Sequence, residues 1–366
     1  MSSAQTIEYM ARALQLARQG HTETTPNPSV GCILVKGHRL IGEGYTQPGG
    51  VPHAEVQAIA SATESVSGAT AYVTLEPCCY QGKSPACSQA LIEAGISRVV
   101  IAMADPNPLV SGEGIRQLEA AGVQVESGIL QEEAAALNPG FNKRMTSGLP
   151  RVTAKLAMSM DGRTAMASGD SQWITGHDAR SDVQRLRSAS CAIVSGVDSV
   201  IKDNSALTVR EFGVRQPLRV VLDSNLRLPA TASILQQPGQ TCVVFVNNSA
   251  SRAEMLERAG AELVPLAADN QGKVDLMACM NWLARRQCNE VLLECGARLA
   301  GEMLREQLID EIVIYMAPVL MGSGARPLFD LPLELMSEKI GLNITDLRAV
   351  GKDWRITAVP SYKAKD

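Results

Sequence analysis

The chain has 366 residues, of which 45% are hydrophobic and 20% are charged, and its formal net charge is −4. This length predicts about two domains. The acidic balance and the absence of any long Lys/Arg run disfavour nucleic-acid binding, which usually relies on a basic surface. The sequence also lacks an apolar run of the roughly 18 residues that a membrane span requires, so we expect no membrane partner.

The N-terminal segment predicts a helix and not a secretion signal. Ile7, Met10, Leu14 and Ala17 recur at helical spacing, and charged residues are interspersed among them. We therefore expect a cytoplasmic protein, in which disulfides are rare. The nine scattered cysteines then indicate metal ligands, nucleophiles or packing residues and not a disulfide framework.

The first half of the chain alternates strand and helix patterns. A hairpin is predicted over residues 30–45, and strands over 69–75, 97–103 and 123–127. Helices are predicted from about Pro52, over about Ser84–Ala94, and before Gly122. This alternation favours a largely parallel sheet with helices on both faces.

The stretch Asn138–Pro150 interrupts the pattern with Pro, Gly and polar residues. We place a domain boundary there, which gives predicted domains over 1–147 and 148–366. The second half is again α/β. Its predicted strands cover residues 151–158, 191–196, 218–223, 241–246, 262–266, 291–295 and 311–320, and its predicted helices cover 178–188, 276–286 and 299–307.

The chemistry of the first half centres on His53 in PHAEV and on the three cysteines of LEPCCYQGKSPAC. A lone histidine near a helix start is more often structural than catalytic. One imidazole with two thiolates, however, is a ligand set that Zn²⁺ accepts readily. Three protein ligands leave one position open for water, and Glu55 then remains as a spare carboxylate, as in a catalytic zinc site.

His53 and Glu55 are two residues apart and cannot face each other on a regular helix. They can converge only if the metal lies beyond the helix tip, and Pro52 supports a helix start there. Pro77 before Cys78 predicts a second helix start aimed at the same point. Glu55 would carry a proton from water to a leaving amine.

These roles are those of zinc nucleobase deaminases, whose signature is H-x-E followed by P-C-x-x-C. The chain has H-A-E and P-C but lacks C-x-x-C. It resembles the bifunctional riboflavin-biosynthesis deaminase/reductase family, the RibD type, over essentially its whole length. TPNPSVGCILV, PHAEV, AYVTLEPC, GKSPAC and DPNP match the deaminase half, and KLAMSMDGRTAMASGDSQWIT, DNSALTVR and ECGARLAG match the reductase half.

The resemblance implies an N-terminal cytidine-deaminase-like α/β/α domain that holds one Zn²⁺ on His53, Cys78 and Cys87, with Glu55 as the catalytic residue. Cys79 is then a bystander, and Asn27 is expected to contact the substrate ribose. For the other six cysteines we expect packing roles. They are Cys32, Cys191, Cys242, Cys279, Cys288 and Cys295.

In the second half, glycines after the strand 291–295 could let a phosphate approach a helix N-terminus, but this signal is weak alone. The resemblance implies a dihydrofolate-reductase-like α/β domain that binds NADPH. The implied cofactor contacts are Ala157, Trp173, Ser199, Asp203, Gly296, Ala297, Arg298, Leu299, Ala300, Gly301 and Glu302. The implied substrate contacts are Ser171, Arg187, Leu207, Arg210 and Glu294, with Lys155 nearby.

The implied function is two consecutive steps of riboflavin synthesis on a phosphoribosylaminopyrimidine: hydrolytic deamination, then NADPH-dependent reduction of the ribosyl group. Arg187 and Arg210 suit the substrate phosphate, because guanidinium binds phosphate bidentately. We also expect a homo-oligomer, a dimer. Three alternatives stay open: a nucleoside or tRNA deaminase with an unrelated C-terminal domain, a non-catalytic zinc protein, and a variant with one inactive domain.

Overall fold

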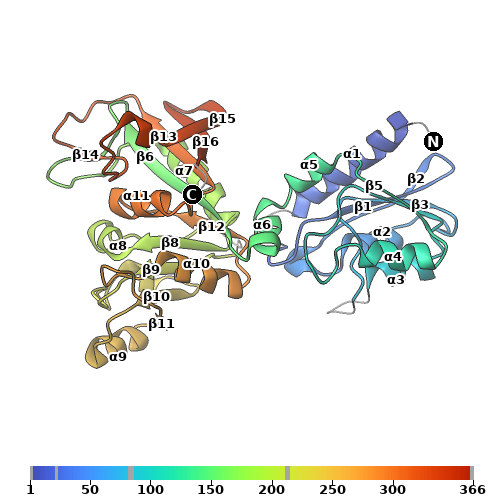
Figure 1. The fold of residues 1–366 in the computed structure, drawn as a ribbon, viewed down its shortest axis with the longest axis horizontal. Coiled ribbons are helices and arrows are strands. Elements are labelled where there is room, and N and C mark those ends of the chain that lie inside the picture. Colours follow the sequence, from blue (N-terminus) through green and yellow to red (C-terminus); the bar gives the residue numbers. More distant parts are fainter. Residues whose placement is uncertain (1–2, 21–23, 81–85, 211–214, 363–366) are drawn as a thin grey trace. The chain divides into compact units, whose positions relative to one another are not determined.

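The computed structural model describes residues 3–20, 24–80, 86–210 and 215–362, and the chain divides into two compact units between Leu149 and Pro150 (Figure 1). Each unit has its own sheet and its own hydrophobic core. Within the described ranges, no helix is long and apolar enough to cross a membrane.

The sheet of the first unit has five strands in the order β2-β1-β3-β4-β5. The strands are β1 (Gly31–Lys36), β2 (Arg39–Tyr45), β3 (Thr70–Val73), β4 (Arg98–Ile101) and β5 (Gln124–Ser127). The expected hairpin β1–β2 is present, and β3, β4 and β5 are parallel. The sheet is nevertheless only half parallel, because β1 also pairs antiparallel with β3. The crossover from β2 through a helix to β3 passes over β1 and makes β3 run in the same direction as β2.

Helices cover both faces of this sheet, as expected. They are α1 (Ser3–Gly20), α2 (Ala54–Ala60), α3 (Cys87–Glu93), α4 (Glu113–Ala120), α5 (Gln131–Ala135) and α6 (Pro139–Ser147), with the 3-10 turn η1 (Pro48–Gly50). Alternation along β1 separates the two cores: Ile33 and Val35 lie in the core of α1, whereas Cys32 and Leu34 lie in the core of α2, α3 and α4. The first unit is therefore an α/β/α sandwich.

The segment Asn138–Pro150, which the sequence suggests as an interruption, contains the helix α6. Pro139 occupies its first turn, where proline needs no hydrogen-bond donor, and Gly148 ends it with a φ of 73°. The same Pro and Gly that indicate a break are thus the start and stop signals of a helix. The predicted start of the earlier helix at Ser84 lies outside the described residues, and that helix is observed from Cys87.

The second unit has a nine-stranded sheet in the order β11-β10-β9-β8-β12-β6-β13-β16-β15. The strands are β6 (Arg151–Ser159), β8 (Ala192–Gly196), β9 (Leu218–Leu222), β10 (Thr241–Phe245), β11 (Ala261–Pro265), β12 (Glu290–Leu293), β13 (Glu311–Ala317), β15 (Gly341–Val350) and β16 (Asp353–Ser361). A two-stranded sheet pairs β7 (Arg163–Ala165) with β14 (Arg326–Pro327). The strands from β11 to β13 are parallel, and β16 and β15 continue antiparallel at one edge. The hairpin β15–β16 lies outside the predicted elements, because charged residues interrupt its apolar pattern.

The helices of this unit are α7 (His177–Ser188), α8 (Val197–Asp203), α9 (Ala250–Arg258), α10 (Leu276–Arg285) and α11 (Ala297–Arg305), with the 3-10 turns η2 (Ser233–Gln236) and η3 (Met336–Glu338). α8 and α9 are additions to the predicted set. Ala179 and Val183 of α7 pack against Val313 and Tyr315 of β13. The second unit is therefore also α/β, as expected.

Candidate active sites

The first site lies at the N-terminal tip of α2. His53 is the N-cap residue of this helix, with φ −72° and ψ 162°, so its ring points off the helix end. Glu55 follows in the first turn and is buried. The convergence of a histidine and an acid two residues apart therefore occurs at a helix tip, as the sequence predicts, although Pro52 precedes the cap instead of occupying the first helical position.

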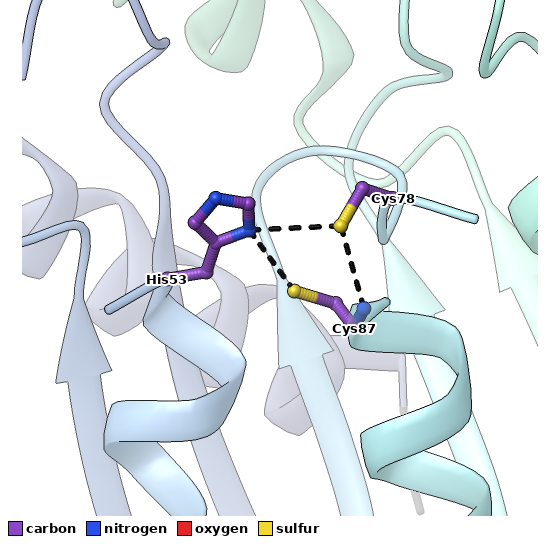
Figure 2. A group of neighbouring side chains, drawn as sticks. All are labelled: His53, Cys78 and Cys87. Carbon is purple, nitrogen blue, oxygen red and sulfur yellow. Dashed lines mark hydrogen bonds between the residues drawn. The ribbon is translucent and has the colours of Figure 1, made fainter. Parts of the chain in front are cut away.

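Two thiols meet the histidine ring (Figure 2). The Nδ1 atom of His53 lies 3.1 Å from the Sγ of Cys87 and 3.6 Å from the Sγ of Cys78. The backbone N–H of Cys87 donates to the Sγ of Cys78 at 3.3 Å. The second helix start is thus at Cys87, in the first turn of α3, and the expectation of a helix start at Pro77–Cys78 is wrong. Cys78 lies in the irregular segment after β3, and its sulfur accepts the free N–H of the α3 terminus.

This arrangement fits a zinc ion. The imidazole nitrogen and the two sulfur atoms lie within 4.8 Å of one another. Zn²⁺ has bonds of about 2.0–2.3 Å to such atoms and so holds them about 3.5–3.8 Å apart. Among the described residues this is the one group of three or more metal-binding side chains that converges in this way. Both short contacts involve Nδ1, so this ring nitrogen is the one that faces the two sulfur atoms.

The electrostatics of the three side chains favour an anionic sulfur. The hydrogen bond from the thiol of Cys87 lowers the pKa of Cys78 to about 4, and the same bond between the two sulfur atoms raises the pKa of Cys87. The hydrogen bond to Cys78 raises the pKa of His53. A thiolate is therefore already favoured on Cys78, and thiolates are the form in which cysteine binds zinc.

Glu55 lies beside this cluster and interacts with the side chain of Cys87. Burial raises its pKa above the usual value, and the negative charge of Cys78 raises it further. A raised pKa brings a carboxyl group closer to the range in which proton transfer is efficient. Glu55 thus has the position and the chemistry of a proton carrier.

Cys79 is directed away from the cluster. Its Sγ donates to the carbonyl of Leu109 at 3.5 Å, and burial raises its pKa.

Five of the six cysteines expected to have packing roles are buried, and Cys295 is half-buried. Asn27 donates from Nδ2 to the carbonyl of Gly50 at 3.3 Å.

Sequence reasoning missed the residue that fixes the loop of Cys78. The carboxylate of Glu76 is 2% exposed and accepts three backbone N–H groups, from Asp105 at 3.2 Å, Gly112 at 3.0 Å and Ile115 at 3.2 Å. Because Glu76 lies two residues before Cys78 and binds three backbone N–H groups, it holds the Cys78 segment in position. The sequence feature that could have identified this residue is the glutamate of the LEPC motif.

The second site is a cleft of about 1760 Å³ in the second unit. It is lined by residues at the C-terminal ends of four neighbouring parallel strands: Ala157 of β6, Glu294 after β12, Ser195 of β8 and Leu222 of β9. Ligands of open α/β sheets bind at this edge, because helix N-termini and loops gather there. The cleft is therefore the candidate site for a nucleotide-sized ligand.

Most of the residues that the resemblance implies do line this cleft. They are Ala157, Ser171, Trp173, Arg187, Ser199, Asp203, Leu207, Arg210, Glu294, Gly296, Ala297, Arg298, Leu299 and Glu302. Ala300 and Gly301 are the exceptions: both are buried in α11 and absent from the lining. A Cβ atom on Gly301 would lie 2.1 Å from the carbonyl oxygen of Asp330. This glycine therefore serves the packing of α11 and not the approach of a ligand.

Arg187 and Glu294 form a mostly buried ion pair beside Lys155. The guanidinium donates to the Glu294 carboxylate at 2.6 and 3.0 Å, and to the carbonyl of Thr208 at 2.9 Å. Lys155 Nζ lies 3.6 Å from the same carboxylate. Burial alone would raise the pKa of Glu294, but Arg187 and Lys155 outweigh burial and lower it to about 2. The guanidinium of Arg187 thus already donates two hydrogen bonds to a carboxylate.

Two cations that the sequence did not single out also line the cleft. A Cβ atom on Gly169 would lie 2.6 Å from the Nζ of Lys202 and 3.4 Å from the Nη2 of Arg326. Both side chains are exposed and belong to the cleft lining. The two cations therefore lie close to each other beside Gly169 and make this part of the cleft suitable for an anionic group.

Three further contacts involve residues that the resemblance implies for the cleft. Ser171 Oγ donates to Asp203 Oδ1 at 3.3 Å. The backbone N–H of Gly296 donates to Ser199 Oγ at 3.1 Å, which joins the start of α11 to α8. The third contact stacks a cation on the exposed ring of Trp173: the Arg180 guanidinium lies 4.6 Å from the ring centroid.

Comparisons with known families match each unit separately. Residues 3–103 match the family described as the cytidine and deoxycytidylate deaminase zinc-binding region, and residues 150–356 match the RibD C-terminal domain. The first match contains His53, Glu55, Cys78 and Cys87. The fold classes expected for the two halves are confirmed.

Full-length relatives cover both units. The chain is 46% identical to riboflavin biosynthesis protein RibD of Escherichia coli over 94% of this chain and 96% of that protein. It is 43% identical to RibD of Haemophilus influenzae, with 98% of each chain covered.

Solved structures with the same two-domain organisation are also similar. RibD of Acinetobacter baumannii is 42% identical, with a TM-score of 0.91 over 98% of this chain and 99% of that chain. The diaminohydroxyphosphoribosylaminopyrimidine deaminase/5-amino-6-(5-phosphoribosylamino)uracil reductase of Thermotoga maritima is 31% identical, with a TM-score of 0.86 over 98% and 99%.

Proposed function

The chain belongs to the RibD family, the bifunctional deaminases and reductases of riboflavin biosynthesis, and from this premise we propose which of its residues perform each reaction. The first reaction replaces the 2-amino group of 2,5-diamino-6-(5-phospho-ribosylamino)pyrimidin-4(3H)-one by a carbonyl, with consumption of water and release of ammonia. The second uses NADPH to reduce the ribosyl group of the deaminated product to a ribityl chain. The observation that carries the proposal is the cluster of His53, Cys78 and Cys87 beside buried Glu55.

For deamination, His53, Cys78 and Cys87 would hold one Zn²⁺ per chain. When bound, zinc would supply the activated water that the hydrolysis consumes. Glu55 would accept a proton from the attacking water and deliver it to the amino group as it leaves. Its place in the first turn of α2, two residues after a ligand, keeps the carboxyl group beside the reacting atoms. Glu76 keeps the Cys78 loop in position through its three backbone hydrogen bonds.

For reduction, NADPH would lie in the cleft at the ends of β6, β12, β8 and β9, and would supply the hydride. Its contacts are Ala157, Trp173, Ser199, Asp203 and the start of α11 from Gly296 to Leu299, together with Glu302. Ala300 and Gly301 act only through the packing of α11. The N-terminus of α11 suits the cofactor's phosphates, because the residues from Gly296 to Leu299 at this helix start line the cleft.

The substrate would bind at the Lys155 end of the same cleft, with contacts from Ser171, Leu207 and the residues of the ion pair. Because Arg187 is already paired with Glu294, we propose that Arg210 carries more of the phosphate recognition than Arg187. The bidentate hydrogen bond from Arg187 to Glu294 then gives Arg187 a positioning role. Lys202 and Arg326 add positive charge to the lining of the same cleft.

We further propose that residues 1–147 act as the deaminase and 148–366 as the reductase, and that the enzyme works in the cytoplasm as a homodimer. A nucleoside or tRNA deaminase is not favoured, because the RibD C-terminal domain family matches residues 150–356. The direct test is mass spectrometry of the products formed from the diamino substrate. The deaminated compound alone is expected without NADPH, and the ribityl product with it. Recovery of unchanged substrate from zinc-loaded protein would exclude the proposal.

A further inference from the structure

Cys78 lies in an irregular segment, where neither a strand nor a helix fixes its backbone. Its sulfur nevertheless has to meet that of Cys87, which belongs to α3 and lies nine residues further along the chain. Metal sites keep each ligand atom within about 0.2 Å of its ideal distance. The backbone of Cys78 therefore needs contacts that hold it in place relative to α3.

The helix α4 supplies such contacts on both sides of Cys78. Before this residue, a Cβ atom added to Gly114 of α4 would lie 2.1 Å from the carbonyl oxygen of Pro77, so the two backbones touch and only glycine fits there. After it, the Nε2 atom of Gln117 donates to the carbonyl of Cys79 at 3.3 Å. The segment of the first sulfur ligand is thus packed directly on α4.

Ser88 connects Gln117 to the helix of the second sulfur ligand. This serine is fully buried and follows Cys87 directly in α3. Its backbone N–H donates to the carbonyl of Cys78 at 3.1 Å, and its hydroxyl donates to Oε1 of Gln117 at 2.7 Å. These hydrogen bonds, with that from Gln117 to Cys79, join two consecutive carbonyls of the Cys78 segment to both α3 and α4.

The side-chain amide of Gln117 can make these hydrogen bonds in only one orientation. The carbonyl of Cys79 only accepts hydrogen bonds, so the Nε2 atom has to face it. The Oε1 atom then faces Ser88, whose hydroxyl has one proton to donate. A carboxylate of the same size could still accept from Ser88, but it would bring a second acceptor against the carbonyl of Cys79. The position therefore requires a donor and not only a side chain of this volume.

We propose that Gln117 and Ser88 are positioning residues of the metal site, an inference that rests on the proposed zinc ligands. Both act through the backbone of Cys78 and Cys79. They fix the sulfur of Cys78 relative to that of Cys87 and so determine how tightly the metal is held. Loss of a hydrogen bond that orients a metal ligand typically lowers metal affinity by roughly 10–100-fold.

The test measures how fast zinc leaves the full chain, with the absorbance of a chromogenic chelator as the readout. At saturation Gln117→Ala and Ser88→Ala should still bind zinc, but they should release it roughly 10–100-fold faster than the wild type. Gln117→Glu should also release it faster, because it lacks the donor to Cys79. Gln89→Ala is the matched control and should match the wild type, since Gln89 lines the same groove as Gln117 but donates to Glu93.

A spectrum separates positioning from a general loss of stability. Co²⁺ bound in place of zinc has a visible spectrum that depends on how its ligands are arranged. This spectrum should change in Gln117→Ala and Ser88→Ala and stay unchanged in Gln89→Ala. If Gln117→Ala fails to fold, Gln117→Glu, which keeps the side-chain size, carries the same comparison.

Zinc release at the wild-type rate from Ser88→Ala and Gln117→Glu, an unchanged Co²⁺ spectrum in the variants, or equally fast release from Gln89→Ala would each overturn the proposal. A wild type that binds no zinc would instead refute the proposed zinc site, so the two failures are distinguishable.

Discussion

The Nδ1 atom of His53 lies 3.1 Å from the Sγ of Cys87, although 34 residues separate them in the chain. The contact exists because the N-termini of α2 and α3 meet at one end of the sheet, and Cys78 completes the group from the segment after β3. Two helix N-termini at one point stabilise negative charge on the sulfur atoms. The stabilised negative charge therefore favours cation binding at this site.

Substitutions of the cluster should separate ligands from a bystander. Cys78→Ser, Cys87→Ser and His53→Ala should each lose zinc, because hydroxyl and methyl groups do not replace thiolate and imidazole. Cys79→Ser should keep zinc and deaminase activity, since its sulfur contacts Leu109 instead. Metal analysis of the four purified variants is the measurement. Loss of zinc from Cys79→Ser with retention in Cys78→Ser would contradict the assignment.

Removal of the carboxyl group of Glu55 should affect chemistry and leave the metal in place. Glu55→Gln should retain zinc but lose roughly 10²–10⁴-fold in the rate of ammonia release, the usual range for a general acid–base group. The rate is measured on zinc-loaded protein. Turnover close to that of the wild type would mean that another group carries the proton.

The two sites should work independently, because each belongs to its own compact unit. Glu55→Gln should fail with the diamino substrate yet oxidise NADPH normally when supplied with the deaminated compound. Asp203→Ala should release ammonia normally and accumulate that compound. NADPH oxidation that vanished in Glu55→Gln with the deaminated compound present would instead indicate one shared site.

Arg210 should matter for substrate binding in the reductase step. Arg210→Gln should raise KM for the deaminated substrate more than it lowers kcat, because a phosphate contact stabilises ground state and transition state alike. Arg185→Gln is the matched control, since Arg185 is exposed and absent from the cleft lining. Equal kinetics for the two variants would remove Arg210 from the phosphate site.

The ion pair of Glu294 should make the reductase unit sensitive to acid. The folded pKa of Glu294 is lowered from its usual value of 4.5 to about 2. A lowered pKa means that the ionised group stabilises the fold fully above pH 4.5 and progressively less as pH falls towards 2. The difference in unfolding free energy between wild type and Glu294→Gln should therefore shrink between pH 5 and pH 2. A difference that stays constant over this range would show that the carboxylate does not titrate as part of the pair.

The sequence alone was sufficient for the local elements and for the chemistry of the first site. Helical spacing identified α1, alternation identified β1 and β2, and the H-A-E and P-C motifs with the family resemblance identified the proposed zinc ligands. These features depend on neighbours in the chain, and residue periodicity records them directly. The same local signals failed at α6, where Pro139 and Gly148 indicate a break and in fact begin and end a helix.

What only the tertiary structure decided depends on contacts between distant segments. No local pattern shows that Cys87, and not Cys78, begins the second helix, that Glu76 fastens residues 105–115, or that Arg187 is already held by Glu294. The same applies to Gly301, where the nearby carbonyl of Asp330, and not a ligand, leaves no room for a side chain. In each case the outcome depends on which backbone donors and side chains come into contact in the folded chain. Local sequence patterns do not reveal these contacts.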